Sequence, residues 1–81
     1  MRVKVRLFAR LREIAGAAEL EREVPDSATL GVIWESLARE FPSMAPYKGS
    51  LSGAVNADYA RMDAAVHEGD EVAFLPPVSG G

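Results

Sequence analysis

The sequence of 81 residues contains no cysteine and only one histidine, His67. The lack of cysteine excludes disulfides, thiolate zinc sites, iron–sulfur clusters and a thiol nucleophile, so a hydrophobic core alone must stabilise the fold. One histidine without cysteine gives no ligand set for a transition metal, and we expect no metal site. No apolar run approaches the ~20 residues that cross a bilayer, and residues 1–6 alternate charge with valine instead of forming a signal-peptide core. We therefore expect a cytoplasmic protein without a membrane partner.

Aromatic residues are also scarce, at 7%, but the 48% hydrophobic and 26% charged fractions are those of an ordinary globular protein. A chain of this length holds a single core and therefore forms one domain. The net charge of −3 argues against a nucleic-acid partner, because nucleic-acid binders carry an excess of basic residues.

Residues 2–8 alternate charged and apolar side chains and predict a strand whose inward side chains are Val3, Val5 and Leu7. Residues 9–16 change to helical spacing, and Gly16 ends one or two helical turns. Residues 18–24 return to alternation and predict a second strand. Arg22 interrupts its inward side, which indicates an edge strand or a bulge.

The main helix is predicted to begin after Thr29, which is a good N-cap, and to end at Pro42, which cannot continue the helical hydrogen bonds. Its apolar face consists of Leu30, Ile33, Trp34, Leu37, Ala38 and Phe41.

The second half of the chain is predicted to form short strands and turns. One helix can cover only one face of a small mixed sheet, so the order of elements predicts a two-layer α+β domain. In chain order we expect a loop over 43–50, a strand over 51–56 that turns at 56–58, a short strand and connection over 59–66, a turn over 67–70 and a last strand over 71–75.

The usual signatures of catalysis are missing. His67 lies in a turn, where we expect it to be solvated. Asp70 and Glu71 are adjacent, so in a strand their side chains would point to opposite faces and could not share acid–base work. The glycines form neither a dinucleotide-binding nor a phosphate-binding motif. We expect no active site within this chain.

A basic row on the first strand admits two interpretations. It could bind phosphate, or it could pair with an acidic row of the same period on the second strand, each cross-strand pair contributing roughly 0.2–1 kcal/mol. We favour the salt-bridged interpretation. The two rows are Arg2, Lys4 and Arg6, and Glu19, Glu21 and Glu23.

Two large apolar side chains, Phe8 and Leu75, fall on the outer face of the predicted sheet. The alternation that directs Val72 and Phe74 inward directs Leu75 outward, and Phe8 likewise has outward parity. Single exposed apolar residues are normal, whereas a contiguous patch would mark a partner site. If the first and last strands are neighbours, Phe8 and Leu75 form such a patch, which Tyr59 could join.

The C-terminus is the second unusual feature. Pro76-Pro77 stops the last strand, and Val78-Ser79-Gly80-Gly81 follows as a predicted extended tail on a domain spanning 1–77. Two terminal residues without β-carbons allow backbone and a free carboxylate to enter a narrow channel of another enzyme. A frayed end is the plain alternative, but here the diglycine follows a strand and a Pro-Pro stop.

Four segments carry a family resemblance that covers nearly the whole chain. They are Val5-Arg6-Leu7-Phe8-Ala9-Arg10-Leu11-Arg12-Glu13, a helix opened by Thr29-Leu30 and closed by Phe41-Pro42, Ala54-Val55-Asn56, and residues 69–81 with their Pro-Pro-Val-Ser-Gly-Gly end. With them the sequence resembles the MoaD family, the small subunits of molybdopterin synthase among the ubiquitin-like sulfur carriers. The resemblance implies a β-grasp fold, a mixed sheet of four to five strands packed on one main helix with a flexible Gly-Gly tail.

The resemblance also implies a carrier cycle. A ubiquitin-activating-like adenylyltransferase would use ATP to adenylate the Gly81 carboxylate, and a sulfur donor would convert it to a thiocarboxylate, 1-thioglycine. The large synthase subunit would receive the tail, and the sulfur would pass to cyclic pyranopterin monophosphate. Catalytic residues would lie on the partners of a heterotetramer, and this chain would hold no permanent cofactor.

Three alternatives remain at this point. The same fold and tail could serve a carrier for thiamine thiazole, tRNA thiolation or cysteine synthesis. An activated Gly81 could also be joined to lysines of target proteins, which would make the chain a protein modifier. A plain interaction domain would leave the Gly-Gly end unexplained.

Overall fold

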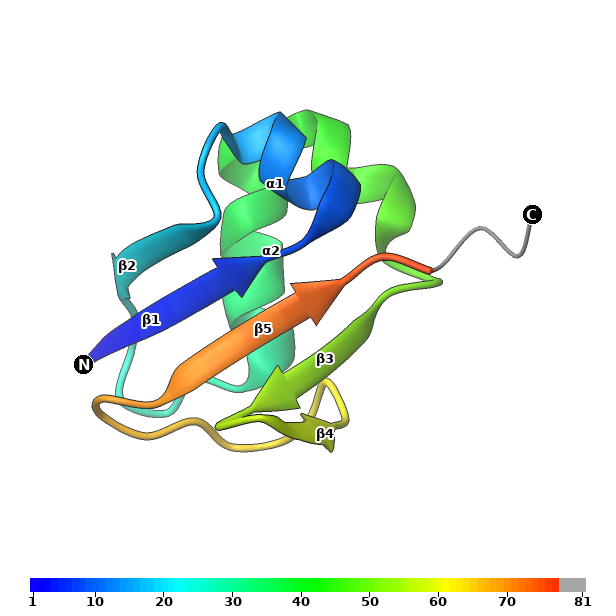
Figure 1. Ribbon diagram of the computed structural model, residues 1–81. Helices are drawn as coiled ribbons and strands as arrows, with labels where there is room; N and C mark the ends of the chain where they lie inside the picture. Colours follow the sequence, from blue (N-terminus) through cyan, green and yellow to red (C-terminus); the bar gives the residue numbers. More distant parts are fainter. Residues whose placement is uncertain (78–81) are drawn as a thin grey trace.

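A five-stranded sheet packs one face against a single long helix (Figure 1). The computed structural model describes residues 1–77. Among these residues, no helix is long and apolar enough to cross a membrane. The elements in chain order are β1 (Arg2–Leu7), α1 (Ala9–Ala15), β2 (Glu19–Glu23), α2 (Leu30–Glu40), the 3₁₀ helix η1 (Pro42–Tyr47), β3 (Ser52–Val55), β4 (Asp58–Ala60) and β5 (Glu71–Leu75).

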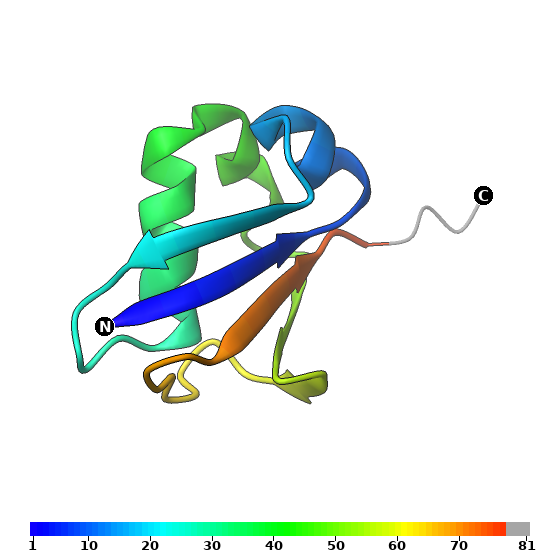
Figure 2. The ribbon, with the colours of Figure 1, turned by 60° about the vertical axis from the view of Figure 1, so that its left-hand side comes forward.

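The strand order is β2-β1-β5-β3-β4, which places the first and last strands side by side at the centre of the sheet. β1 and β5 are parallel, and the other neighbouring pairs are antiparallel. The helix covers one face and leaves the other open, as Figures 1 and 2 both show. The predicted α+β class and mixed sheet are confirmed.

The core forms between α2 and the inward side chains of the two central strands. β1 alternates exposed and buried residues along its whole length, so the inward parity predicted for Val3, Val5 and Leu7 is correct. Gly53 allows the helix to approach the sheet closely, because a Cβ there would lie 2.5 Å from Cδ2 of Leu30. The fully buried side chains include Val3, Val5, Leu7, Leu30, Ile33, Leu37, Val72 and Phe74.

The backbone N–H groups in the first turn of α2 all have hydrogen-bond partners. The Thr29 hydroxyl accepts a hydrogen bond from the backbone N–H of Val32 at 3.2 Å, which confirms Thr29 as the N-cap. The N–H groups of Leu30 and Gly31 donate to carbonyls of the connection after β4, at Ala64 and Met62. The helix ends at Glu40, directly before Phe41 and Pro42 as predicted.

The loop expected over residues 43–50 is wrong for its first part, where η1 spans Pro42–Tyr47. Met44 is completely buried, and its N–H donates to the carbonyl of Phe41 at 2.8 Å. Pro42 suits the first turn of such a helix because its missing N–H has no partner to lose. The burial of Met44 depends on the rest of the fold, so the local composition gave no sign of it.

β2 is an edge strand with unbroken register against β1, from Arg2↔Glu23 to Arg6↔Glu19. The edge interpretation of Arg22 is therefore correct, and the strand carries no bulge in this register. Nη2 of Arg22 contacts Oε1 of Glu40 at 2.8 Å, so this inward charge is paired at the end of α2.

Candidate functional site: the open sheet face and the root of the tail

The open face of the sheet carries a small apolar surface. Cross-strand register places Ala54 of β3 opposite both Tyr59 of β4 and Ala73 of β5, and all three point away from α2. With Phe8 and Leu75 they line an open hollow of about 260 Å³. The lining thus combines two small side chains, Ala54 and Ala73, with three large ones, Phe8, Tyr59 and Leu75.

The structure brings the three predicted partner-binding residues to this one hollow, which we call the docking face. Phe8 is 39% exposed and Tyr59 is 80% exposed, while Leu75 is half-buried. Their contact with a partner stays a prediction. The alternation that directs Leu75 outward also directs Ala73 outward, as the structure has it. Sequence reasoning missed Ala54, because its face is known only once the register of β3 and β5 is known.

Charged groups border the docking face. The Arg6 guanidinium lies 5.9 Å from the centre of the Phe8 ring, within the range of a cation–π contact. Nη1 of Arg6 also lies 3.7 Å from Oε2 of Glu71. A cation and an anion therefore lie side by side at the edge of the apolar surface.

The remaining basic side chains of β1 are paired with the acidic row of β2, as predicted. Arg2 contacts Glu21 at 3.2 Å and Glu23 at 3.3 Å, and Nζ of Lys4 lies 3.8 Å from Glu19. Each cation of this row has a carboxylate neighbour, so the salt-bridged interpretation is correct.

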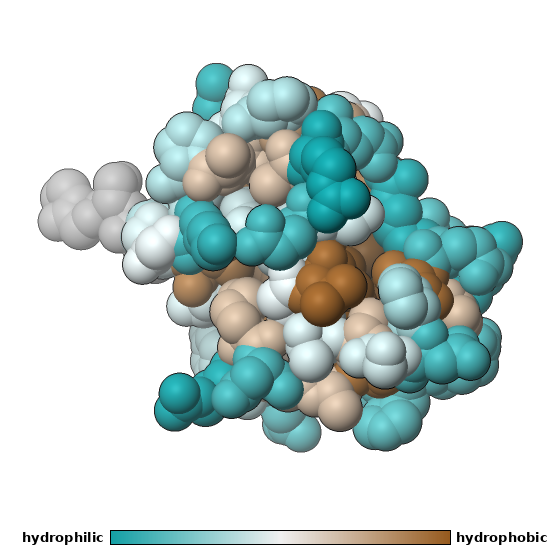
Figure 3. All heavy atoms as spheres, turned by 180° about the vertical axis from the view of Figure 1, so that it is seen from behind, coloured by the Kyte–Doolittle hydropathy of each residue, from teal (hydrophilic) through white to brown (hydrophobic). Residues whose placement is uncertain are grey.

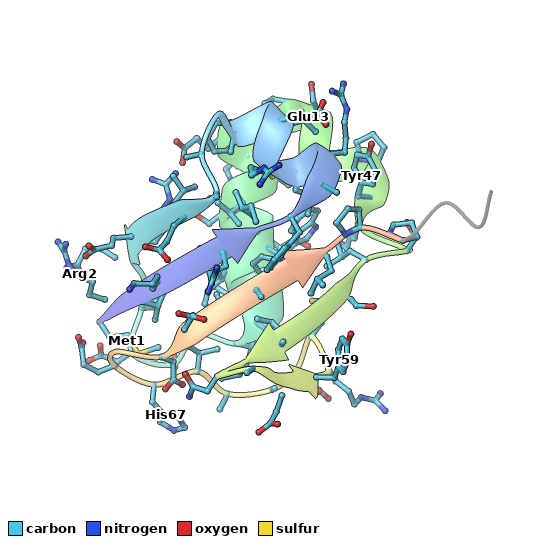
Figure 4. The ribbon with its side chains drawn as sticks, viewed as in Figure 1. Met1, Arg2, Glu13, Tyr47, Tyr59 and His67 are labelled. Carbon is cyan, nitrogen blue, oxygen red and sulfur yellow. The ribbon has the colours of Figure 1, made fainter. Side chains whose placement is uncertain are left out.

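A second hollow, of about 540 Å³, adjoins the docking face where β5 ends. Phe8 and Leu75 belong to both hollows, and the second one is also lined by Ala9, Arg10, Tyr47, Pro76 and Pro77. Tyr47 lies at this end of the sheet, and Met1 and Arg2 lie at the opposite end (Figure 4). Apolar surface therefore continues from the docking face to Pro77, the root of the predicted tail.

Val78, Ser79, Gly80 and Gly81 lie outside the described residues. The tail conformation expected for 78–81 and the activation of Gly81 therefore stay predictions.

A cluster of hydrogen-bonded polar groups connects the turns at the start of β5, the end opposite the root of the tail. Asp70 accepts hydrogen bonds from the Asn56 amide at 3.0 Å and from the backbone N–H of His67 at 2.8 Å. These bonds lower the pKa of the Asp70 carboxyl. Asn56 Oδ1 in turn accepts from the backbone N–H of Glu71. His67 is 80% exposed, as expected.

Sequence reasoning missed this cluster, because Asn56 and Asp70 meet only when β3 pairs with β5. Across residues 1–77 no three histidine or carboxylate side chains come together as a metal site.

The sheet order, the parallel central pair and the single covering helix define a ubiquitin-like β-grasp protein. A ubiquitin from Caldiarchaeum subterraneum shares this fold, with a TM-score of 0.64 at 18% identity over 100% of this chain and 98% of that one. The model of the ThiS family matches residues 5–81. The chain belongs to the ThiS family, and its resemblance to MoaD-type sulfur carriers is confirmed.

Relatives at higher identity include two molybdopterin synthase sulfur carrier subunits. The one from Arabidopsis thaliana is 37% identical over 79 residues, covering 98% of this chain and 82% of the relative. The one from Haemophilus influenzae is 38% identical over 81 residues, covering 98% and 99%. Small archaeal modifier protein 3 from Haloferax volcanii is 32% identical over 92 residues and is covered completely, as is this chain.

Two further solved structures share the fold over the full length of both chains. SAMP1 from Haloferax volcanii superposes with a TM-score of 0.86 at 30% identity. In a complex of subunits 1 and 2 of the molybdopterin-converting factor from Helicobacter pylori, the matching chain has a TM-score of 0.69 at 22% identity.

Proposed function

We propose that this chain is the sulfur-carrier subunit of a molybdopterin synthase, and that the Gly81 carboxylate carries the sulfur. The observation that supports it most directly is the continuity of the apolar docking face with the root of a Gly-Gly terminus. A carrier needs such a surface to hold its partners while a thin end reaches their reactive groups.

The chemistry explains why the chain needs no catalytic groups of its own. A carboxylate is a poor electrophile, so an adenylyltransferase first joins Gly81 to AMP and releases pyrophosphate from ATP. A sulfur donor then displaces AMP and leaves a thiocarboxylate. In the synthase this sulfur is transferred to cyclic pyranopterin monophosphate by residues of the large subunit. The part of this chain is to bind and to position its terminus.

The proposal implies three kinds of partner in the cytoplasm: a large synthase subunit, a ubiquitin-activating-like adenylyltransferase and a sulfur donor. The first two would use the same docking face in turn, because both must receive the tail that leaves beside it. A heterotetramer would contain two copies of each synthase subunit. The complex of subunits 1 and 2 of the molybdopterin-converting factor from Helicobacter pylori, whose matching chain has the same fold, supports a large-subunit partner.

A second candidate is a protein modifier whose Gly81 is joined to lysines of other proteins. The full-length similarity to small archaeal modifier protein 3 supports this second candidate. Both candidates share the adenylation step, and they differ in the nucleophile that displaces AMP.

Intact-mass measurement tests the proposal. The chain is incubated with an activating enzyme, ATP and a sulfur source, and one sulfur is expected to replace one oxygen at the C-terminus. Deleting Gly81, or adding one residue after it, should abolish this change and leave the fold intact. A mass change that persists in either variant contradicts activation at Gly81, and high-mass conjugates without a thiocarboxylate would favour the modifier.

A further inference from the structure

Asn56 continues the pairing of β3 with β5 beyond the point where β3 ends. The last residue pair of this ladder is Val55↔Val72, so Asn56 and Glu71 would be the next one. The backbone N–H of Asn56 donates to the carbonyl of Glu71 at 2.7 Å. Oδ1 of Asn56 accepts the backbone N–H of Glu71 at 3.0 Å, in the place that a backbone carbonyl takes in a regular antiparallel pair. The Asn56 side chain therefore replaces one backbone group of the ladder.

The backbone of Asn56 has turned away from β3 at the same residue. Its φ is 50° and that of Ala57 is 72°, so both residues of the turn to β4 are left-handed. A two-residue turn of a hairpin favours this backbone, and asparagine adopts it more readily than most residues. Asn56 thus completes the ladder with its side chain while its backbone begins the turn.

Asp70 fixes the other side of the Asn56 amide. Oδ1 of Asp70 accepts from Nδ2 of Asn56 at 3.0 Å, and Oδ2 accepts the backbone N–H of His67 at 2.8 Å. The carbonyl of Asp70 accepts the N–H of Lys4 at 3.0 Å, so Asp70 is itself connected to β1. Through these bonds the turn after β3 is joined to both β1 and the start of β5.

The position of β4 depends on this turn. β4 has three residues, lies at the edge of the sheet and pairs with β3 (Figure 1). Its middle residue, Tyr59, lies opposite Ala54. A register slip of one residue would direct Tyr59 to the other face of the sheet. The turn and the start of β5 also border the docking face, since Ala57 and Glu71 line its hollow together with Tyr59.

We propose that Asn56 is a positioning residue of the docking face. Its hydrogen bonds to Asp70 and Glu71 fix the turn, and the turn sets the register that directs Tyr59 to the open face. A partner then meets a surface that is already ordered and does not have to order the hairpin as it binds. The effect on binding rests on the proposed function, which supplies the partner, whereas the placement of Tyr59 does not.

Exchanging the two side chains tests this role. In N56D/D70N the carboxylate at position 56 can accept from the Glu71 N–H and from the amide at position 70, whose oxygen can accept the His67 N–H. All three side-chain hydrogen bonds are then restored, with the net charge unchanged. In N56D alone, two carboxylates meet where the 3.0 Å hydrogen bond was. The matched control for removal of a carboxylate is D63N, because Asp63 is 81% exposed and pairs with Arg61.

Nuclear Overhauser contacts between the Tyr59 ring and the Ala54 methyl group report the placement of Tyr59 without any partner. Residues directly opposite each other have Cβ atoms about 4.5–5.5 Å apart, which is close enough for such contacts. We expect the contact in the wild type, in N56D/D70N and in D63N, and its loss in N56D and D70N.

Titration calorimetry with a purified large subunit of molybdopterin synthase measures the consequence for binding. N56D should weaken binding roughly three- to tenfold, because the hairpin must then be ordered by the partner, and N56D/D70N should recover the wild-type affinity. In a Y59A background N56D should cause little further loss, since the residue that Asn56 positions has been removed. A residue that only supported the core would lower the affinity by the same factor with or without Tyr59.

Three results would overturn the proposal: a Tyr59–Ala54 contact that persists in N56D, an exchange that restores neither contact nor affinity, or an equal loss from N56D in the Y59A background. If N56D does not fold, N56G replaces it with the same expected losses, because glycine accepts a φ of 50° and lacks the side chain. If the contact follows the exchange but the wild type does not bind the large subunit, the proposed function alone is wrong. If binding is normal and the contact ignores these substitutions, this inference alone is wrong.

Discussion

Trp34 of α2 and Phe74 of β5 pack with their ring centroids 5.3 Å apart and their planes tilted by 55°. Both side chains are at most 2% exposed. Tilted aromatic pairs at this separation are favourable beyond their buried area. The contact joins the only long helix among residues 1–77 to the strand that leads to the tail, so it couples the core to the position of the root.

Phe74→Ala should lower the free energy of unfolding by about 3–5 kcal/mol, because it removes a fully buried ring and leaves a cavity beside Trp34. Denaturant titration followed by Trp34 fluorescence measures this loss. Phe74→Leu serves as the control and should cost less, since it keeps most of the apolar volume. An unchanged midpoint for Phe74→Ala would contradict the inward packing of this residue.

The strands were predictable because one face of the sheet is buried and the other is exposed to solvent. This difference imposes a period of two on β1 and β5, and the same parity placed Phe8 and Leu75 outside. The 3₁₀ helix was not predictable, since Pro42, Pro46 and small residues also occur in loops. Its defining feature, the buried Met44, exists only against the finished core.

The candidate site likewise has one part that the sequence predicts and one part that it does not. The outward parity of Phe8, Ala73 and Leu75 follows from local alternation. Ala54 and Tyr59 join this surface only through the pairing of β3 with β5 and β4. The neighbourhood of Tyr47 and Pro77 likewise joins residues far apart in the sequence. No local pattern reports such contacts, because they depend on the order of strands in the sheet.

Ala57→Gly should stabilise the protein. Asn56 and Ala57 form the turn between β3 and β4 with φ of 50° and 72°, and a left-handed backbone is strained for alanine. Relief of that strain, reduced by the greater freedom of glycine in the unfolded chain, should add about 0.5–1 kcal/mol to the free energy of unfolding. Urea titration measures it. Ala60→Gly, within β4, should instead destabilise, and a loss of stability in Ala57→Gly would contradict the turn geometry.

Asp70 should make stability depend on acid pH. Its hydrogen bonds from Asn56 and the His67 backbone hold the pKa of the carboxyl below its ordinary value. A lowered pKa in the folded state means that the stabilisation is fully present above the unfolded pKa, about 3.9, and is lost as the pH falls through the folded pKa.

The free energy of unfolding of the wild type and of Asp70→Asn should therefore differ most near pH 7, and the difference should shrink below about pH 4. Urea titrations across this range supply the comparison. Glu35→Gln removes a second carboxyl whose pKa is lowered, in the ion pair with Lys48 outside this cluster. Its titration shows how much of the acid sensitivity comes from a carboxyl other than Asp70. A difference that is constant with pH would show that Asp70 does not carry the acid sensitivity.

The docking face yields the most direct test of partner binding. Phe8→Ala and Leu75→Ala should each weaken binding to a large synthase subunit by more than tenfold, since a buried apolar anchor is typically worth ~2 kcal/mol or more on truncation. Each should cost less folding stability than Phe74→Ala, because both side chains are partly exposed in the free chain. Titration calorimetry and thermal unfolding measure the two effects.

Val32→Ala is the matched control for these variants. Val32 is an exposed apolar residue, 45% accessible, but it belongs to α2 on the helix side of the molecule, where apolar groups lie within a largely hydrophilic surface (Figure 3). If partners bind the open sheet face, this truncation leaves their affinity unchanged. Equal losses for Val32→Ala and Phe8→Ala would mean that binding is not localised to that face. Normal affinity with severe unfolding in Phe8→Ala and Leu75→Ala would instead show that these side chains support the core, and the partner would have to bind elsewhere.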